Sequence, residues 1–124
     1  MKLHEYITAH LDEPFCYGKL DCVLFAAGWI KHVTGTDVLD GIPEWNSEKE
    51  ALRAINSVGG IQTRLDESFG RVRPEMALDG DITVVDGIVY LFSGSHIVST
   101  GESGLKFLGR EKALCAWAVK GKDG

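Results

Sequence analysis

Apolar residues near the N-terminus recur at the spacing of helical turns. Between residues 3 and 11 they fall at i, i+3, i+4, i+7 and i+8, which predicts an amphipathic helix that Pro14 closes. From Cys22 onward, apolar residues cover most of a helical circumference until Gly35 supplies a stop. We therefore expect this second helix to be the central and most buried one.

A third helix is predicted by its own start and stop signals. Ser47 is followed three residues later by Glu50, which is the capping-box pattern, and the glycine pair 59–60 ends the segment. Few of its residues are apolar, so we expect it to be more exposed than the second helix. A weaker helical pattern follows over residues 61–69.

After Pro74 the pattern changes to short β-rich runs that glycines separate. The runs are 82–85, 88–92, 96–100, 105–108 and 116–119. Five strands in sequence predict an antiparallel meander. Because the helices come first and the strands second, the predicted fold class is α+β, with N-terminal helices packed on a C-terminal antiparallel sheet of about five strands.

The composition is that of one globular domain. The chain has 124 residues, of which 44% are hydrophobic, and this is enough for a modest core. We expect a single domain over residues 1–124, with a mainly helical part at 1–73 and a β-meander part at 74–120.

Charge and hydropathy exclude two classes of partner. The net charge is -5 and the lysines and arginines are scattered singly, so no surface for nucleic acid is expected. No run approaches the roughly 20 apolar residues of a membrane helix, and residues 1–11 lack the apolar segment of a secretory signal. We expect a protein that is made in the cytosol and does not insert into a membrane.

The cysteines point to free thiols. Cys16, Cys22 and Cys115 are an odd number without an export signal, which argues against a disulfide framework. Their spacing lacks the paired pattern of a zinc site, so we expect neither a metal nor a cofactor.

Cys22 has two interpretations. It opens the apolar helix directly after a loop, where a reactive cysteine would sit, because the positive end of the helix dipole and unpaired N–H groups lower the pKa of a thiol. The alternative is that Cys22 is one more small buried hydrophobic residue. Asp21 would oppose ionisation of the thiol if its carboxylate faced the sulfur, so we expect Asp21 to cap backbone donors of the turn.

Several short motifs together resemble one family. These are "FCYGKLDCVLFAAGWI", "VTGTDV", "MALDGDITVV" and "GLKFLGREKALCAW". In order and spacing they resemble the NlpC-type cell-wall endopeptidases of the papain-like superfamily, and are most similar to small, divergent members that phage tail genes encode. The resemblance implies a papain-like NlpC-type fold over the chain.

The resemblance also implies roles for individual residues. Cys22 matches the nucleophile, and its N–H together with the Tyr17 hydroxyl matches an oxyanion site. A histidine opens the second strand of active relatives, but here Gly87 or Ile88 falls at that position. His96 opens the third strand instead, where relatives carry the residue that orients the imidazole.

Two functions follow from these expectations. The first is a phage tail-tip or tail-assembly component, made in the host cytoplasm and located in the virion, that binds other tail proteins. The second is a cysteine peptidase or amidase that cleaves peptidoglycan stem peptides, with Cys22 as nucleophile and His96 as base. The missing second-strand histidine favours the first function, because a thiol without a general base is a poor catalyst of amide cleavage. The loop that contains Ile42 and Trp45 is a candidate contact surface for partners, and the equal alternative is that Trp45 folds inward as part of the core.

Overall fold

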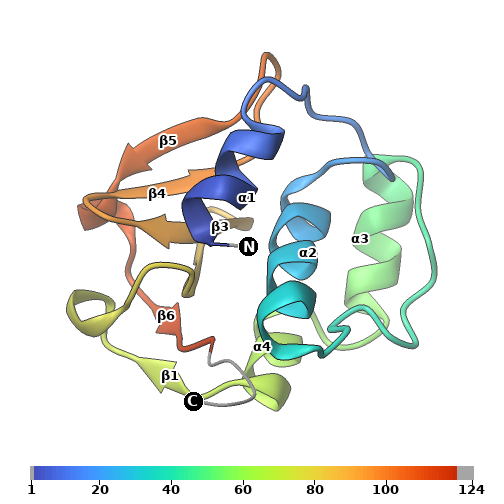
Figure 1. The fold of residues 1–124 in the computed structure, drawn as a ribbon. Helices are drawn as coiled ribbons and strands as arrows, with labels where there is room; N and C mark the ends of the chain where they lie inside the picture. The colour runs from blue at the N-terminus through green and yellow to red at the C-terminus, as the bar shows by residue number, and fades with distance from the viewer. Residues whose placement is uncertain (1, 120–124) are drawn as a thin grey trace.

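The computed structural model describes residues 2–119 and shows an α+β fold of four helices and a six-stranded antiparallel sheet (Figure 1). The helices are α1 (Leu3–His10), α2 (Cys22–Thr34), α3 (Glu48–Asn56) and α4 (Ile61–Ser68). The strands are β1 (Arg71–Val72), β2 (Ile82–Val85), β3 (Ile88–Ser93), β4 (His96–Ser99), β5 (Lys106–Gly109) and β6 (Ala116–Trp117). The predicted α+β class is therefore confirmed. Met1 and residues 120–124, which the predicted single domain includes, lie outside the described residues.

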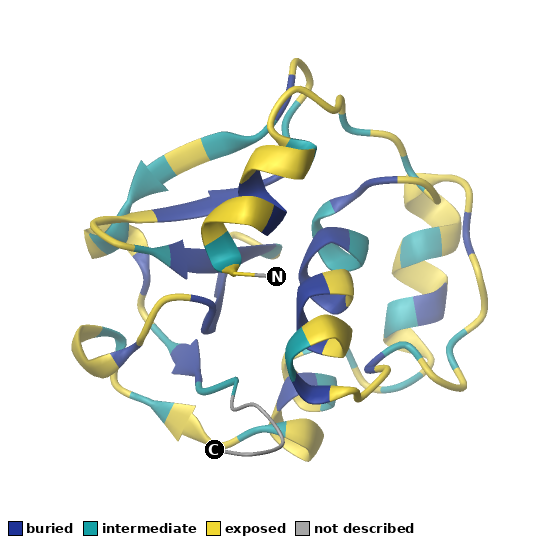
Figure 2. Ribbon diagram, viewed as in Figure 1, coloured by how far each residue is buried: buried dark blue, intermediate teal, exposed yellow. Residues whose placement is uncertain are grey.

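Helix α2 is the central helix, as its apolar sequence predicts. It lies beside the sheet, and α3 covers the side of α2 that faces away from the sheet (Figure 1). The helix ends at Gly35, whose φ of 76° is the left-handed conformation that glycine adopts without a Cβ penalty. The burial colouring shows the contrast with α3, which is largely exposed (Figure 2).

The order of the strands differs from the predicted meander. Strands β2 to β5 do pair in sequence, but the sheet order is β1-β6-β2-β3-β4-β5, so the last strand returns to the side of β2. Trp117 pairs with Ile82 of β2 and with Arg71 of β1. Both residues of β6 are fully buried, and a strand buried in this way belongs inside a sheet and not at its edge.

Strand β1 was not predicted, and it lies within the part of the chain expected to be mainly helical. Its two residues carry no alternating pattern that a sequence reading could detect, and it exists through its pairing with β6. The other strand boundaries agree with the sequence pattern within about two residues, the usual uncertainty of such assignments.

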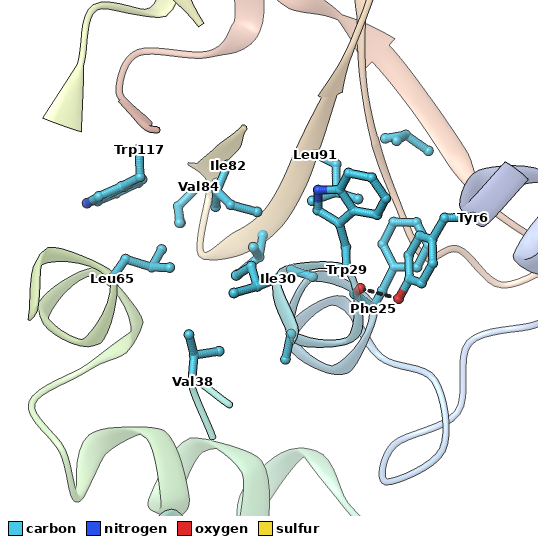
Figure 3. Packing of buried hydrophobic residues seen from close by; sticks show 14 of the residues in the cluster. Tyr6, Phe25, Trp29, Ile30, Val38, Leu65, Ile82, Val84, Leu91 and Trp117 are labelled. Carbon is cyan, nitrogen blue, oxygen red and sulfur yellow. Dashed lines mark hydrogen bonds between the residues drawn. The ribbon is translucent and has the colours of Figure 1, made fainter. Parts of the chain in front are cut away.

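The sheet buries apolar residues on both faces. Along β3, Val89 and Leu91 pack on the α2 side, whereas Ile88, Tyr90 and Phe92 belong to a second cluster on the opposite face. Figure 3 shows the α2 side, where residues from helices and strands meet in one core. This alternation decides which residues of β3 turn toward the start of α2.

Helix α1 is held against α2 by one buried hydrogen bond. The Tyr6 hydroxyl donates to the carbonyl of Phe25 at 2.6 Å (Figure 3). Gly28 permits this approach, because a Cβ there would lie 2.6 Å from the Tyr6 oxygen. Burial raises the pKa of Tyr6 to about 12.

Candidate functional site

The candidate site is built at the N-terminus of α2, where Asp21 is the N-cap. Its Oδ1 accepts the N–H of Leu24 at 2.9 Å, and its Oδ2 accepts the N–H of Gly18 at 3.4 Å. The carboxylate is buried, so these donors replace the water it loses. The expectation that Asp21 caps backbone donors is therefore confirmed.

Trp45 completes this frame, and of the two places left open for it, contact surface or core, the structure shows the buried one. Its indole N–H donates to Asp21 Oδ2 at 2.6 Å, and the side chain is only 5% exposed. The carboxylate of Asp21 stabilises the indole in its buried position, since a buried indole N–H needs an acceptor. Gly18 packs so closely against this loop that a Cβ would lie 2.5 Å from the Trp45 carbonyl oxygen. The Tyr17-Gly18 turn, the loop and the helix start are thus packed together and joined by hydrogen bonds.

A groove of about 770 Å³ opens beside these packed segments. The helical half of the chain contributes Tyr17 and Cys22 to its walls, and the strand half contributes residues 86–88, Thr100 and Lys106. The two halves are joined next to the groove, where the N–H of Phe15 donates to the carbonyl of Gly101 at 2.9 Å. Three of the four predicted site residues, Cys22, Asp21 and Tyr17, therefore line one groove.

Cys22 is the first residue of α2 and is half-buried. Burial raises the pKa of its thiol, and the nearby Asp21 carboxylate acts in the same direction. A hydrogen bond from the backbone of Val89 and the charge of Lys106 lower this pKa but do not outweigh burial. The expectation that the helix N-terminus activates the thiol is thus wrong in its net direction, because desolvation is the larger effect.

Tyr17 lies where the resemblance expects an oxyanion donor. Its ring is half-buried and stacks edge-on against Phe15, with ring centroids 4.6 Å apart. Burial raises the pKa of its hydroxyl, and the charges of Glu48, Cys22 and Asp21 add to this effect. The hydroxyl therefore keeps its proton at neutral pH and is a hydrogen-bond donor at the groove.

The start of β3 lies against the thiol, but it brings no imidazole. The interaction of Val89 with Cys22 joins this strand to the start of α2, and residues 86–88 line the groove. Ile88 packs with the cluster on the face away from α2. Gly87 is the open position, since a Cβ there would meet no atom within 4 Å. No histidine lines the groove among the residues that the structure describes.

The structure does not bring His96 to Cys22. His96 is exposed and pairs with Ser93 at the end of β3, four residues beyond Val89 and so about 13 Å along the strand. Its ring lies edge-on to Phe107, with centroids 6.3 Å apart, and Nδ1 is 3.2 Å from the Ser95 hydroxyl. These contacts belong to the β4–β5 region and not to the groove.

Lys106 and Thr100 are among the groove residues that sequence reasoning missed. Lys106 comes from β5 and its charge reaches the Cys22 thiol, and Thr100 follows β4 with its hydroxyl buried. Both are common polar residues within the predicted β-rich runs 96–100 and 105–108, and only the pairing of β4 with β5 brings them to the helix start. No local signal in the sequence distinguishes them.

Residues 2–119 hold neither a metal-binding cluster nor a membrane-spanning helix. No group of three or more histidine, cysteine, aspartate or glutamate side chains there is arranged to hold a metal ion. Within the same range, no helix is long and apolar enough to cross a membrane.

Comparison with known proteins gives one match. Residues 1–119 match the family described as "Domain of unknown function (DUF6950)". No curated protein and no solved structure matches the chain. Since this match spans nearly the whole sequence, the chain belongs to the DUF6950 family.

Proposed function

We propose that this protein is a phage tail-tip or tail-assembly component that uses a degenerate NlpC-like, papain-type fold as a protein-interaction module. Its partners are other tail proteins, and its place is the tail of the virion. The tail assignment is supported by the sequence resemblance, and the loss of catalysis by the geometry of the groove.

The arrangement of α2 and the sheet supports the papain-like fold. A cysteine opens the buried central helix, the following strands are antiparallel, and the second long strand, β3, lies against the thiol. This is the arrangement that the resemblance implies for a nucleophile and its base.

A single observation carries the interaction function: the groove holds a nucleophile position without a base. Gly87 and Ile88 occupy the place expected for the imidazole, and the pKa of the Cys22 thiol is raised. A protonated thiol with no imidazole beside it lacks the general base that would form the thiolate and the general acid that would protonate the leaving amine.

The position of Cys22 favours a second function, cleavage of peptidoglycan stem peptides. Its thiol lies in a groove with the Tyr17 hydroxyl nearby, which matches a nucleophile and an oxyanion donor. His96 would have to cross the length of β3 to act as the base, so this function is the weaker candidate.

Peptide cleavage tests the two functions directly. Purified protein is incubated with peptidoglycan and stem peptides beside Cys22→Ala and His96→Ala, with the exposed Cys16→Ala as the matched control, and products are identified by mass spectrometry. We expect no cleavage above the Cys22→Ala background. Robust cleavage that both Cys22→Ala and His96→Ala abolish, and Cys16→Ala does not, would falsify the interaction function.

The tail assignment has its own test. Mass spectrometry of purified virions of a phage that encodes this chain is expected to detect it at a copy number matching a tail component. Its absence from virions, with normal expression in infected cells, would contradict the assignment.

A further inference from the structure

We propose that the groove beside Cys22 binds an extended polypeptide segment in which lysine or arginine flanks apolar side chains. This inference rests on the proposed function, because it gives the partner's chemistry at the same groove. It commits to a cationic, apolar segment of a partner protein as the occupant.

The walls of the groove are largely apolar. Residues from α2, α3 and α4 line it, among them Val23, Leu52, Ile55 and Ile61. Leu52 is 57% exposed although it is one of the larger apolar side chains of α3. A volume of about 770 Å³ lies within the usual range of about 300–1,000 Å³ for ligand pockets. Apolar side chains of a partner would remove this surface from water.

The charges at the groove favour a positively charged partner. Its charged lining residues are Asp21, Glu48, Asp86, Glu102 and Lys106, which give a net charge of -3. Asp21 is buried under its hydrogen-bond donors. Glu48, Asp86 and Glu102 are exposed, and none forms an ion pair within residues 2–119. Three unpaired carboxylates around an apolar groove complement lysine or arginine.

Lys106 offsets only one of these negative charges. Its ammonium group lies 5.6 Å from the centre of the Tyr90 ring, in a cation–π contact at the sheet. It forms no ion pair with a carboxylate in the part of the chain that the structure describes. The field at the groove therefore stays negative.

A buried hydroxyl favours a polypeptide as the occupant. Thr100 lines the groove and is 4% exposed, and its Oγ1 has no hydrogen-bond partner among the described residues. Buried polar groups nearly always have a partner in native structures. The backbone of an extended segment offers both N–H and C=O groups, so a small shift of the wall would let it bond to this hydroxyl.

Two fluorescein-labelled peptides test the inference. The probes are Lys-Leu-Ile-Leu-Lys and its twin Glu-Leu-Ile-Leu-Glu, and binding to the full chain is measured by fluorescence anisotropy at low salt. We expect the lysine peptide to bind at least about tenfold more tightly, and to weaken as salt is added, because rim charges are screened. Bound peptide should also slow alkylation of Cys22 but not of the exposed Cys16.

Matched variants locate the charge effect. The variant with Glu48→Gln, Asp86→Asn and Glu102→Gln keeps the shape of the groove, and asparagine tolerates the φ of 52° at position 86. It should lose the preference for the lysine peptide. The control variant with Asp12→Asn, Glu75→Gln and Glu111→Gln neutralises three exposed acids outside the groove and should keep it.

The outcomes separate this inference from the proposed function. Equal binding of the two peptides, no binding of either, or binding that leaves Cys22 alkylation unchanged overturns the inference while the interaction function stands. If the protein cleaves a peptide and this cleavage requires Cys22, the interaction function is overturned instead.

Discussion

The reactivity of Cys22 depends on two opposing effects on one side chain. A helix N-terminus favours a thiolate by interactions that fall off within one turn, whereas burial removes the solvation of the charge altogether. The raised pKa of Cys22 shows that burial and the Asp21 carboxylate prevail. A sequence reveals the helix start but not the depth of the groove, so only the first effect was predictable.

Alkylation rates test this balance at the residue scale. We expect Cys22 to react more slowly with iodoacetamide than the exposed Cys16 at pH 7, because Cys22 is less accessible and burial raises the pKa of its thiol. The rate at Cys22 should still be rising with pH where an ordinary thiol, whose pKa is about 8.5, has become fully ionised and has levelled off. Mass spectrometry of the modified protein resolves each cysteine. Faster reaction at Cys22 than at Cys16 would contradict the raised pKa.

The N-cap of Asp21 was predictable from its place before an apolar helix, but its bond to Trp45 was not. Twenty-four residues separate the two, and no periodicity links a carboxylate to an indole in a later loop. Candidate site residues were therefore found where the signal is local, at the helix start. The groove-lining Lys106 and Thr100 were missed because strand pairing brings them there.

At the scale of elements, the two helix caps differ in how much each contributes to the free energy of unfolding. Asp21→Ala removes a cap and leaves the buried indole N–H of Trp45 without an acceptor, so we expect a loss of about 2–4 kcal/mol in the free energy of unfolding. Ser47→Ala removes only the cap of the exposed helix α3 and should cost about 1 kcal/mol. Urea denaturation measures both. Equal costs would show that the Trp45 bond adds nothing to stability.

The contact between α1 and α2 predicts a loss of stability at alkaline pH. The folded chain keeps the Tyr6 proton up to a pKa of about 12, whereas the unfolded chain releases it near 10. Between these values the native state binds more protons, so stability falls as pH rises, by up to roughly 2–3 kcal/mol. Tyr6→Phe removes the titrating group and should flatten this part of the curve. An unchanged slope between pH 10 and 12 would contradict it.

Helices and the β2–β5 hairpins were predictable because their signals are local. Caps, glycine stops and alternation fix where each begins and ends, and the Asp86-Gly87 turn joins β2 to β3 directly. The pairing of β6 with β2 was not predictable, since the apolar character of a run does not determine which strand it pairs with. Burial of Trp117 selects the place inside the sheet.

At the scale of the whole molecule, the groove exists because the two halves of the chain meet. The helix that starts at Cys22 and the turn before β3 come from opposite halves, and each alone offers no site. We propose that this meeting point keeps a papain-like arrangement from which the imidazole is missing. This proposal requires that a side chain at position 87 faces the thiol of Cys22.

Restoring an imidazole at that position tests the claim most directly. Gly87→His is compared with Gly94→His at the other end of β3; both glycines have positive φ, 79° and 60°, and open space for a Cβ, so both variants carry a similar strain. The measurement is the rate of Cys22 alkylation at pH 6.5, with folding checked by circular dichroism. We expect Gly87→His to raise the rate by about tenfold, because an imidazolium beside the thiol lowers its pKa, and Gly94→His to leave it unchanged. Equal rates in two folded variants would contradict the papain-like placement of the thiol and the account built on it.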